Sequence, residues 1–366
     1  MRLGLINLKL LVKYMPEVSR ILSYVEALNE ATAHVMETDP SVFLFGLDVD
    51  DHLGINGTTL GLSQRFGEGR VFGTPLSEDA MTGVAIGAAM AGQRPIHVHI
   101  RMDFLMLCMN QLINVAAKAH YMYGGTVKVP MVVRSIIGKS WGQGAQHSQG
   151  LYSFFMHVPG LKVVAPSNAY DAKGCLIQAV EDDNPVIFVE HRLLYNTKAE
   201  VPDKAYRIPF GKAKVVREGN DVTIVGISNM VVECLRANKI LEEVGISSEI
   251  IDPVSLMPLD LETILKSVKK TGHLLVVDNG WTSCGASAEI IASISELLED
   301  QLIKTSRLGY EPTTCPTSPI LEKAFYPNPV TIAEKTFSMV RPSSPEWHPS
   351  TKLAELAYQT EFKGPF

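Results

Sequence analysis

The chain has 366 residues, of which 46% are hydrophobic and 20% are charged, and its formal net charge is −6 at pH 7. That length accommodates two domains with ordinary cores, and the longest apolar stretch, Val84 to Gly92, is far shorter than the roughly 20 residues that cross a bilayer. We therefore expect no membrane span. Because the sequence also has no basic stripe, we expect no nucleic-acid partner.

The first 18 residues form a predicted N-terminal extension. Met1 to Lys13 is basic and apolar, as in a short export signal, but no small-residue cleavage site follows it. A helical pattern comes next, with apolar residues at Ile21, Leu22, Val25, Leu28 and Val35. We therefore interpret residues 1–18 as an extension and begin the first domain at residue 19.

Residues 19–195 alternate between strand-like and helical segments. Such alternation is typical of a parallel sheet covered by helices on both faces. The expected strands cover 41–49, 94–100, 127–137, 161–166 and 185–190, and helices are expected over 78–91, 104–121 and 170–180.

A stretch rich in Pro and Lys, residues 196–209, is expected to be a linker to a second domain over 210–340. The predicted fold class is α/β, with two domains that are each a mostly parallel sheet with helices on both faces. Residues 341–366 hold four prolines and are expected to form a peripheral arm. Within the second domain, strands are expected at 221–227, 248–252 and 273–277, and helices at 231–244 and 290–298.

The cysteines indicate a reducing compartment. They are odd in number and include no Cys-x-x-Cys pair, lying at Cys108, Cys175, Cys234, Cys284 and Cys315. This usage is typical of reduced thiols and not of a disulfide framework or a zinc knuckle. We therefore expect a cytoplasmic protein.

Glu78 lies in the first turn of a predicted helix that is rich in small residues. A carboxylate at that position has an ordinary role, because it interacts favourably with the helix dipole by about 0.3 to 1 kcal/mol. Catalysis is the alternative interpretation. The glycines and alanines between Gly83 and Gly92 weaken a helix, so we expect them to serve close packing against another helix.

A glycine-rich loop, Gly138 to Gly150, follows the strand that ends at Ile137 and carries His147. Its Gly-Lys-Ser triplet is not a phosphate-binding loop, because Val133 stands where that motif needs its first glycine. Ligands of α/β sheets usually bind beyond the ends of parallel strands. His147 is therefore a candidate acid, base or oxyanion donor, and a solvated loop residue is the alternative.

Two further groups could hold a metal ion. His97 and His99 face the same side of a predicted strand, but zinc needs three or four ligands, so we expect a structural role. The turn Asp182 to Pro185 could hold a hard cation through carboxylate and carbonyl oxygens, or it could be a plain capping turn.

A series of motifs in fixed order points to a known family. Over residues 19–340 the chain resembles the β subunit of thiamine-diphosphate-dependent 2-oxoacid dehydrogenases (the E1 component), which is related to the C-terminal half of transketolase. The motifs are RVFGTPLSE at 70–78, the small-residue helix at 83–92, Asp103-Phe104, Gln111 to Lys118, QHSQ at 146–149, PGLKVVAP at 159–166, DAKG at 171–174, NPVIF at 184–188, PLD at 258–260 and SVKKTG at 267–272.

The resemblance implies a thiamine diphosphate site. Glu78 matches the acid that hydrogen-bonds N1′ of the aminopyrimidine ring, and burial against Leu76 would raise its pKa so that it keeps a proton to share. Phe104 matches the aromatic residue that packs on this ring, and Ile100 matches a second cofactor-binding position. His147 matches the histidine beside the reacting carbon. The implied catalytic residues are thus Glu78 and His147, and the implied cofactor-binding residues are Leu76, Glu78, Ile100 and Phe104.

The resemblance also implies metal ions and a partner. Magnesium holds the cofactor's diphosphate on a Gly-Asp-Gly motif in the family, and this triplet occurs nowhere in the sequence. An α subunit that carries Mg²⁺ is therefore implied, in an α2β2 heterotetramer, with no activity of this chain alone. The family's structural potassium ion is held largely by main-chain oxygens, which match Met131, Ala179, Val180, Asp182 and Asn184 here.

Several positions depart from the dehydrogenase pattern. Leu47 stands in place of an acid, and Val98 to Arg101 stand in place of Glu-Ile-Gln-Phe. His99 and Arg101 could bring positive charge towards an anionic substrate such as a sugar phosphate, or they could face outward. Residues 190–196 and 278–281 are more similar to a divergent branch found in bacterial polysaccharide and specialised pathways.

The resemblance implies one leading function and two alternatives. The leading expectation is a subunit of an enzyme that decarboxylates a 2-oxoacid, with pyruvate as the expected substrate, and passes the two-carbon unit to a lipoyl carrier or acyltransferase. A transketolase-like carboligase that transfers the unit to a sugar or another carbonyl acceptor is the first alternative. A non-catalytic assembly subunit is the second.

Overall fold

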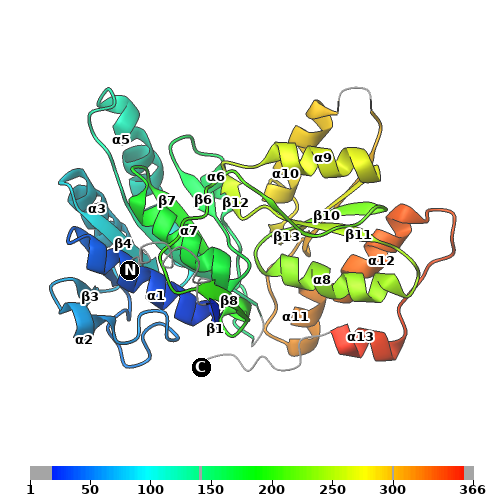
Figure 1. Ribbon diagram of the computed structural model, residues 1–366, viewed down its shortest axis with the longest axis horizontal. Coiled ribbons are helices and arrows are strands. Elements are labelled where there is room, and N and C mark those ends of the chain that lie inside the picture. The colour runs from blue at the N-terminus through cyan, green and yellow to red at the C-terminus, as the bar shows by residue number, and fades with distance from the viewer. Residues whose placement is uncertain (1–18, 140–141, 299–300, 358–366) are drawn as a thin grey trace, which may run out of the picture.

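The computed structural model describes residues 19–139, 142–298 and 301–357, which form two α/β domains side by side (Figure 1). The α/β fold class expected from the sequence is confirmed. The expected N-terminal extension, residues 1–18, and the end of the expected C-terminal arm, residues 358–366, lie outside the described residues.

The first domain is built on a seven-stranded sheet in the order β12-β6-β7-β5-β4-β2-β3. Neighbouring strands are parallel except β12 and β6. Every residue of β5 and β7 is buried, as expected for central strands with helices on both sides. The strands are β2 (Val42–Gly46), β3 (Val71–Gly73), β4 (Arg94–His99), β5 (Val132–Ile137), β6 (Lys162–Val164), β7 (Val186–His191) and β12 (Ser255–Met257).

Helices cover both faces of this sheet. On one face α1 (Tyr24–Thr38) packs against α7 (Ala169–Glu181), and α1 begins at a capping box in which Ser23 and Glu26 exchange hydrogen bonds. On the other face lie α3 (Glu78–Met90) and the segment 102–122. Short helices α2 (Leu62–Phe66) and α6 (Ser153–Met156) lie in the connections.

The start of the first domain differs from the prediction. Ile21 and Leu22, expected in a helix, lie in β1 (Ser19–Ser23), which pairs antiparallel with β8 (Lys198–Pro202). Because β8 falls within residues 196–209, that stretch is not only a linker. A two-stranded pairing between distant segments leaves no local periodicity, so the sequence pattern did not indicate it.

The single helix expected over 104–121 is interrupted. The segment consists of α4 (Met102–Leu105), the 3₁₀ turn η2 (Met106–Cys108), the π-helical η3 (Asn110–Ala116) and α5 (Ala117–Met122). π-Helical segments are frequent at functional sites. This one lies directly after the motif that carries Phe104.

The second domain has a five-stranded sheet in the order β14-β13-β10-β11-β9, parallel except for β9. The helices α8 (Asn229–Glu242) and α12 (Pro329–Val340) cover one face, and α9 (Leu261–Thr271) and α10 (Ala286–Leu297) cover the other. The strands of this sheet are β9 (Lys214–Arg217), β10 (Val222–Gly226), β11 (Ser248–Asp252), β13 (His273–Trp281) and β14 (Lys304–Tyr310), and two further helices of the domain are α11 (Pro319–Phe325) and α13 (Thr351–Ala357). The short η4 (Arg192–Leu194) belongs to the end of the first domain.

The expected C-terminal arm is partly helical, because α13 lies within it and packs against α8 and α12. Its Trp347 ring stacks on Phe337 of α12, with centroids 4.9 Å apart. This part of the arm is therefore a covering element of the second domain.

The two domains share one hydrophobic core. Its residues include Phe45 of the first sheet, Phe155 of the connection and Val276 of the second sheet. The strand β12 follows β11 of the second sheet in the chain but pairs with β6 in the first sheet, and the Tyr152 hydroxyl donates a hydrogen bond to Asp278. The segment after β5 is therefore held between the domains.

No helix in the described part of the chain is both long enough and apolar enough to cross a membrane. All five cysteines are free thiols, and Cys284 alone among them is exposed. This agrees with the expectation that the chain has no disulfide framework.

Candidate active site

The candidate residues follow the ends of four strands of the first sheet. Parallel strands all end at the same edge, so residues that follow them meet there. Glu78 follows β3, Arg101 and Phe104 follow β4, His147 follows β5, and Arg192 follows β7. Segments that are far apart in the sequence are thereby gathered at one edge.

Glu78 is the first residue of α3, and its side chain is half-buried. Leu76 keeps 79% of its surface exposed. The expectation that Leu76 buries the Glu78 carboxyl is therefore wrong for this chain alone, because the turn before α3 leaves Leu76 at the surface. Ile100, two residues before α4, is half-buried.

The two histidines of β4 lie beneath this helix. The hydroxyl oxygen of Thr82, one turn after Glu78, is 3.5 Å from Nε2 of His99, and the rings of His97 and His99 meet edge to face 4.3 Å apart. Burial lowers the pKa of His99 well below its usual value and that of His97 to about 4. Both rings are therefore neutral near pH 7, and the expectation that His99 brings positive charge to a substrate is wrong.

Phe104 and His147 form an edge-to-face pair. Their ring centroids are 5.3 Å apart and their planes are inclined by 78°. Phe104 is 36% exposed and His147 is half-buried, so both rings lie at the surface of this edge. The structure thus brings together the aromatic residue and the histidine that the family motifs suggested.

Asp103 holds the end of the loop that carries His147. One oxygen of its carboxylate accepts hydrogen bonds from the main-chain nitrogen of Gln149 at 3.2 Å and from the side-chain amide at 2.9 Å. Burial raises the pKa of Asp103, and these hydrogen bonds oppose that shift.

The second domain holds the same loop from the other side. The main-chain nitrogen of Gly142 donates to the Glu322 carboxylate at 3.3 Å. A Cβ atom added at Gly150 would lie 1.7 Å from the main-chain oxygen of Asn279, so this glycine permits close contact between two backbones. The position of His147 therefore depends on both domains.

Two arginines meet beside this loop. Nη1 of Arg101 and Nη1 of Arg192 donate to the same oxygen, Oε1 of Gln143, at 2.9 and 2.8 Å. Arg101 is half-buried and Arg192 is buried. Burial, followed by the charge of Arg101, lowers the pKa of Arg192 to about 10. Both guanidinium groups remain charged at neutral pH, so this part of the edge carries positive charge.

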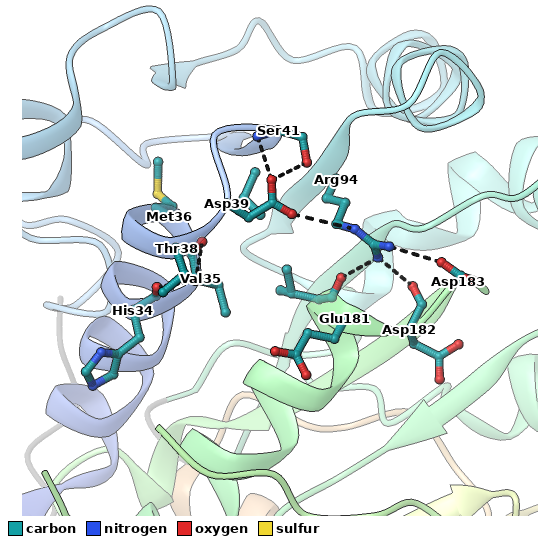
Figure 2. Close-up of polar contacts among 12 residues, drawn as sticks. His34, Val35, Met36, Thr38, Asp39, Ser41, Arg94, Glu181, Asp182 and Asp183 are labelled. Atoms are coloured by element: carbon teal, nitrogen blue, oxygen red, sulfur yellow. Dashed lines mark hydrogen bonds and ion pairs between the residues drawn. The ribbon is translucent and has the colours of Figure 1, made fainter. Parts of the chain in front are cut away.

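Figure 2 shows Arg94 at the turn that matches the family's potassium site. Its Nη1 donates to the main-chain oxygens of Val180 and Asp182 at 2.8 and 3.2 Å, and its Nη2 donates to the Asp183 carboxylate at 3.0 Å. Two of the expected potassium ligands therefore already accept hydrogen bonds from a guanidinium group.

The other expected ligands are engaged as well. The main-chain oxygens of Met131 and Ala179 accept hydrogen bonds from main-chain nitrogens. The Asp182 carboxylate accepts from the main-chain and side-chain nitrogens of Asn184 at 2.9 and 3.0 Å and also forms an ion pair with Lys162. Arg94 and Lys162 thus place two side-chain cations at the turn where the family motifs predict a potassium ion. In the described part of the chain, no cluster of three His, Cys, Asp or Glu side chains could hold a metal ion.

Both domains match known families. The family model of the transketolase pyrimidine-binding domain matches residues 21–198, and that of the transketolase C-terminal domain matches residues 211–332. The chain is 43% identical over 327 residues to the β subunit of acetoin:2,6-dichlorophenolindophenol oxidoreductase from Cupriavidus necator, which covers 86% of this chain and 96% of that protein. The chain belongs to the dehydrogenase E1 β-subunit family.

Other members of the E1 β-subunit family agree. The mitochondrial pyruvate dehydrogenase E1 β subunit of Dictyostelium discoideum is 44% identical over 281 residues, with 76% of this chain and 79% of that protein covered. A structure described as a split-gene transketolase, an inactive β4 tetramer, has a TM-score of 0.71 at 20% identity and covers 87% of this chain and 98% of its own. That likeness concerns the fold alone.

The resemblance drawn from the sequence motifs is thus confirmed. The E1 β-subunit family depends on thiamine diphosphate and consists of oxidoreductase subunits that function with α subunits. These relatives do not favour the carboligase or the non-catalytic alternative.

Three residues of this edge are not evident from the sequence: Gln143, Gln149 and Arg192. Gln143 and Gln149 lie in the loop that carries His147, and Arg192 lies in the stretch 190–196, but nothing in the sequence pattern singles them out. The available signal for Arg192 is its position two residues after the strand expected to end at residue 190, because ligands of α/β sheets usually bind beyond strand ends. Its proximity to Arg101 could not be read from spacing.

Proposed function

We propose that this chain is the β subunit of a thiamine-diphosphate-dependent enzyme that decarboxylates a 2-oxoacid, with pyruvate as the expected substrate. The observation that carries the proposal is the meeting of Glu78, Phe104 and His147 at one sheet edge in a member of the E1 β-subunit family. The five free thiols support a reducing compartment such as the cytoplasm.

The residues at this edge fit half of the cofactor. Leu76 and Phe104 expose apolar surface at the same sheet edge as the half-buried Glu78 carboxyl, which suits an aromatic ring that hydrogen-bonds a carboxyl group. When bound, thiamine diphosphate supplies the carbon nucleophile of the reaction. In this proposal Glu78 exchanges a proton with N1′ of the aminopyrimidine, Phe104 packs on that ring, and His147 donates a hydrogen bond near the reacting carbon.

We further propose that an α subunit completes the site, holds Mg²⁺ with the diphosphate and joins an α2β2 heterotetramer. One face of α3 has few protein atoms packed against it, and this supports the proposal. An added Cβ at Gly87 would meet no atom within 4 Å, and one at Gly83 would meet atoms no nearer than 3.8 Å. Val84 and Met90 of the same helix are exposed. A helix with such a flat, apolar surface suits close packing against another subunit.

Assembly is tested with a substitution on that face. Gly87→Leu has room to fold, so we expect the isolated chain to keep its thermal unfolding midpoint and to lose at least tenfold in affinity for the α subunit. Gly69→Leu is the matched control, because Gly69 also has no atom within 4 Å. Native mass spectrometry of the co-expressed subunits measures assembly for both variants, and thermal unfolding of the isolated chain measures the midpoint. A heterotetramer that forms equally well with Gly87→Leu would contradict the proposed interface.

Activity is tested on the assembled complex with thiamine diphosphate and Mg²⁺. We expect pyruvate-dependent CO₂ release with 2,6-dichlorophenolindophenol as electron acceptor, and a fall of at least 100-fold for Glu78→Gln. Glu296→Gln, an exposed glutamate of α10, is the control. Full activity of the Glu78→Gln complex would instead favour a non-catalytic subunit. Replacing the dye by lipoamide or by a sugar aldehyde distinguishes a lipoyl carrier from a carboligase acceptor.

A further inference from the structure

Asp103 and Phe104 are consecutive residues of α4, and both contact the loop that carries His147. The Phe104 ring packs against the imidazole, with ring centroids 5.3 Å apart. Oδ1 of Asp103 accepts two hydrogen bonds from Gln149, one from the main-chain nitrogen at 3.2 Å and one from Nε2 at 2.9 Å. This dipeptide therefore holds the loop at two points that lie two residues apart.

The backbone between His147 and Gln149 is short enough to couple their positions. The nitrogens of the imidazole must stay available to the reactants in the proposed reaction, so the position of His147 depends on its ring contact and on the loop backbone. Two residues of chain span at most about 7 Å, and Ser148, which lies between them, is only 3% exposed. A displacement of Gln149 is therefore passed on to His147.

Two arginines favour the charged form of Asp103. Burial lowers the pKa of Arg101 and Arg192, and the Asp103 carboxylate opposes that shift for both. Because the attraction is mutual, the guanidinium groups counteract the burial that raises the pKa of Asp103. A charged acceptor makes hydrogen bonds roughly twice as strong as a neutral one. The carboxylate thus holds both nitrogens of Gln149 more firmly than a neutral amide oxygen would.

We propose that Asp103 is a positioning residue for His147: its carboxylate fixes Gln149, and the short backbone segment between them places the imidazole. This inference deepens the proposed function and rests on it, because His147 is there expected to donate a hydrogen bond near the reacting carbon. Such a donor acts mainly as charge develops in the transition state, so misplacing it lowers kcat more than it changes KM. A displacement of about 1 Å can cost on the order of 100-fold in rate.

The first test is a substitution that keeps the size of the side chain. In the complex with the α subunit, Asp103→Asn should lower kcat for pyruvate at least tenfold and change KM less than threefold. Asp260→Asn is the matched control, because Asp260 also accepts main-chain hydrogen bonds, from Ala213 and Thr263, and lies in the second domain. We expect its kcat to stay within twofold of the wild-type value. An unchanged kcat for Asp103→Asn, or a loss confined to KM, would overturn the inference.

A second variant tests the link through Gln149 and decides the matter if Asp103→Asn does not fold. Gln149→Ala removes the side-chain donor and keeps the main-chain donor, so kcat should fall at least threefold, with Gln178→Ala at a half-buried position of α7 as control. In the double variant the two losses should not multiply, because both substitutions break the same contact. An unaffected kcat in Gln149→Ala, or losses that multiply, would show that Asp103 acts elsewhere and contradict the proposal.

A spectroscopic measurement separates this inference from the proposed function. An active complex in which neither substitution changes kcat would refute the inference alone, whereas a complex that decarboxylates no 2-oxoacid would refute the proposed function. In the second case, NMR of isotope-labelled histidines in the full chain decides about Asp103, with the His147 signals assigned from His147→Gln. Gln149→Ala changes no charge, so we expect it to shift the His147 signals and to leave those of the exposed His120 unchanged. Unshifted His147 signals would overturn the inference.

Discussion

Phe104 and His147 meet edge to face, with ring centroids 5.3 Å apart. Such a pair contributes about 0.5 to 1.5 kcal/mol beyond the area it buries, so it restricts the orientation of the imidazole ring. Phe104 comes from the segment after β4, and His147 comes from the loop after β5. The histidine is therefore positioned by a neighbouring strand's connection as well as by its own loop.

Replacing Phe104 by leucine should impair the reaction without unfolding the chain. Because Phe104 is 36% exposed, its loss removes little core packing. The lost orientation of His147 should reduce kcat about tenfold, which corresponds to about 1.4 kcal/mol. Steady-state kinetics of the complex measures this, with Phe154→Leu as a control because Phe154 is exposed on α6. An unchanged kcat would show that the ring contact does not matter.

Breaking the ion pair between Arg134 and Glu190 should be costly. Arg134 donates from Nε and Nη2 to the two carboxylate oxygens at 2.5 and 2.9 Å, and both side chains are fully buried. Arg134→Met leaves the buried Glu190 carboxylate with only the Tyr195 hydroxyl as a donor and without its opposite charge, so we expect the free energy of unfolding to fall by about 3 to 5 kcal/mol.

Urea unfolding of that variant and of the double variant Arg134→Met/Glu190→Leu measures how much the ion pair contributes to the free energy of unfolding. The double variant should regain much of the loss, because no buried charge then remains. Arg207→Met, which breaks an exposed pair with Glu181, should cost at most about 1 kcal/mol. A double variant that is less stable than the single one would contradict this explanation.

Asp252 should make stability depend on pH. Burial raises the pKa of its carboxyl group to about 7, although Ser167 donates a hydrogen bond that lowers it. Between about pH 4 and pH 7 the folded chain therefore holds a proton that the unfolded chain has lost. The contribution of this group to stability falls as pH rises through that range, by on the order of 2 to 4 kcal/mol.

Asp252→Asn should remove this component and flatten the pH dependence of the unfolding midpoint between pH 5 and pH 8. Ser167→Ala removes the donor to the carboxylate, so it should move the transition to higher pH. Chemical unfolding at several pH values measures both. The opposite slope, with stability of the wild-type chain lost on acidification and restored by Asp252→Asn, would contradict the assignment.

Gly150→Ala should separate the His147 loop from the second domain. The added methyl group would lie 1.7 Å from the main-chain oxygen of Asn279, so one of the two backbones must move. We expect a lower thermal midpoint and a loss of at least tenfold in activity. Gly69→Ala, which has free space, should change neither quantity. Normal activity of Gly150→Ala would mean that the interdomain contact does not position His147.

Potassium should have little effect on this chain, although the family motifs predict a site for it. Arg94 and Lys162 already donate to the expected oxygens. We expect the same thermal midpoint in KCl and NaCl, and a loss of about 2 to 3 kcal/mol for Arg94→Gln because several charge-assisted hydrogen bonds disappear. Lys128→Gln, which breaks an exposed contact with Asp183, is the control. A thermal unfolding midpoint that rises in KCl but not in NaCl would support a bound potassium ion.

Much of the fold and part of the site could be predicted from the sequence. The strands β4, β5 and β7 and the helices α3 and α7 were all anticipated, because buried parallel strands and amphipathic or small-residue helices leave short-range patterns. Glu78 and His147 were found because each follows a strand and lies in a motif. The antiparallel pairing of β1 with β8 and the broken helix after Phe104 were missed, because tertiary contacts decide them.

Local periodicity and motifs in fixed order were enough to predict the α/β class and the family, and they single out Glu78 and His147 as candidates. Tertiary contacts decide that the pKa of His99 is lowered, that Arg94 donates to two of the expected cation ligands, and that Arg101 and Arg192 share one amide oxygen. The physical reason is that burial and the proximity of charges depend on which strand ends are brought together, and spacing along the chain does not specify those distances.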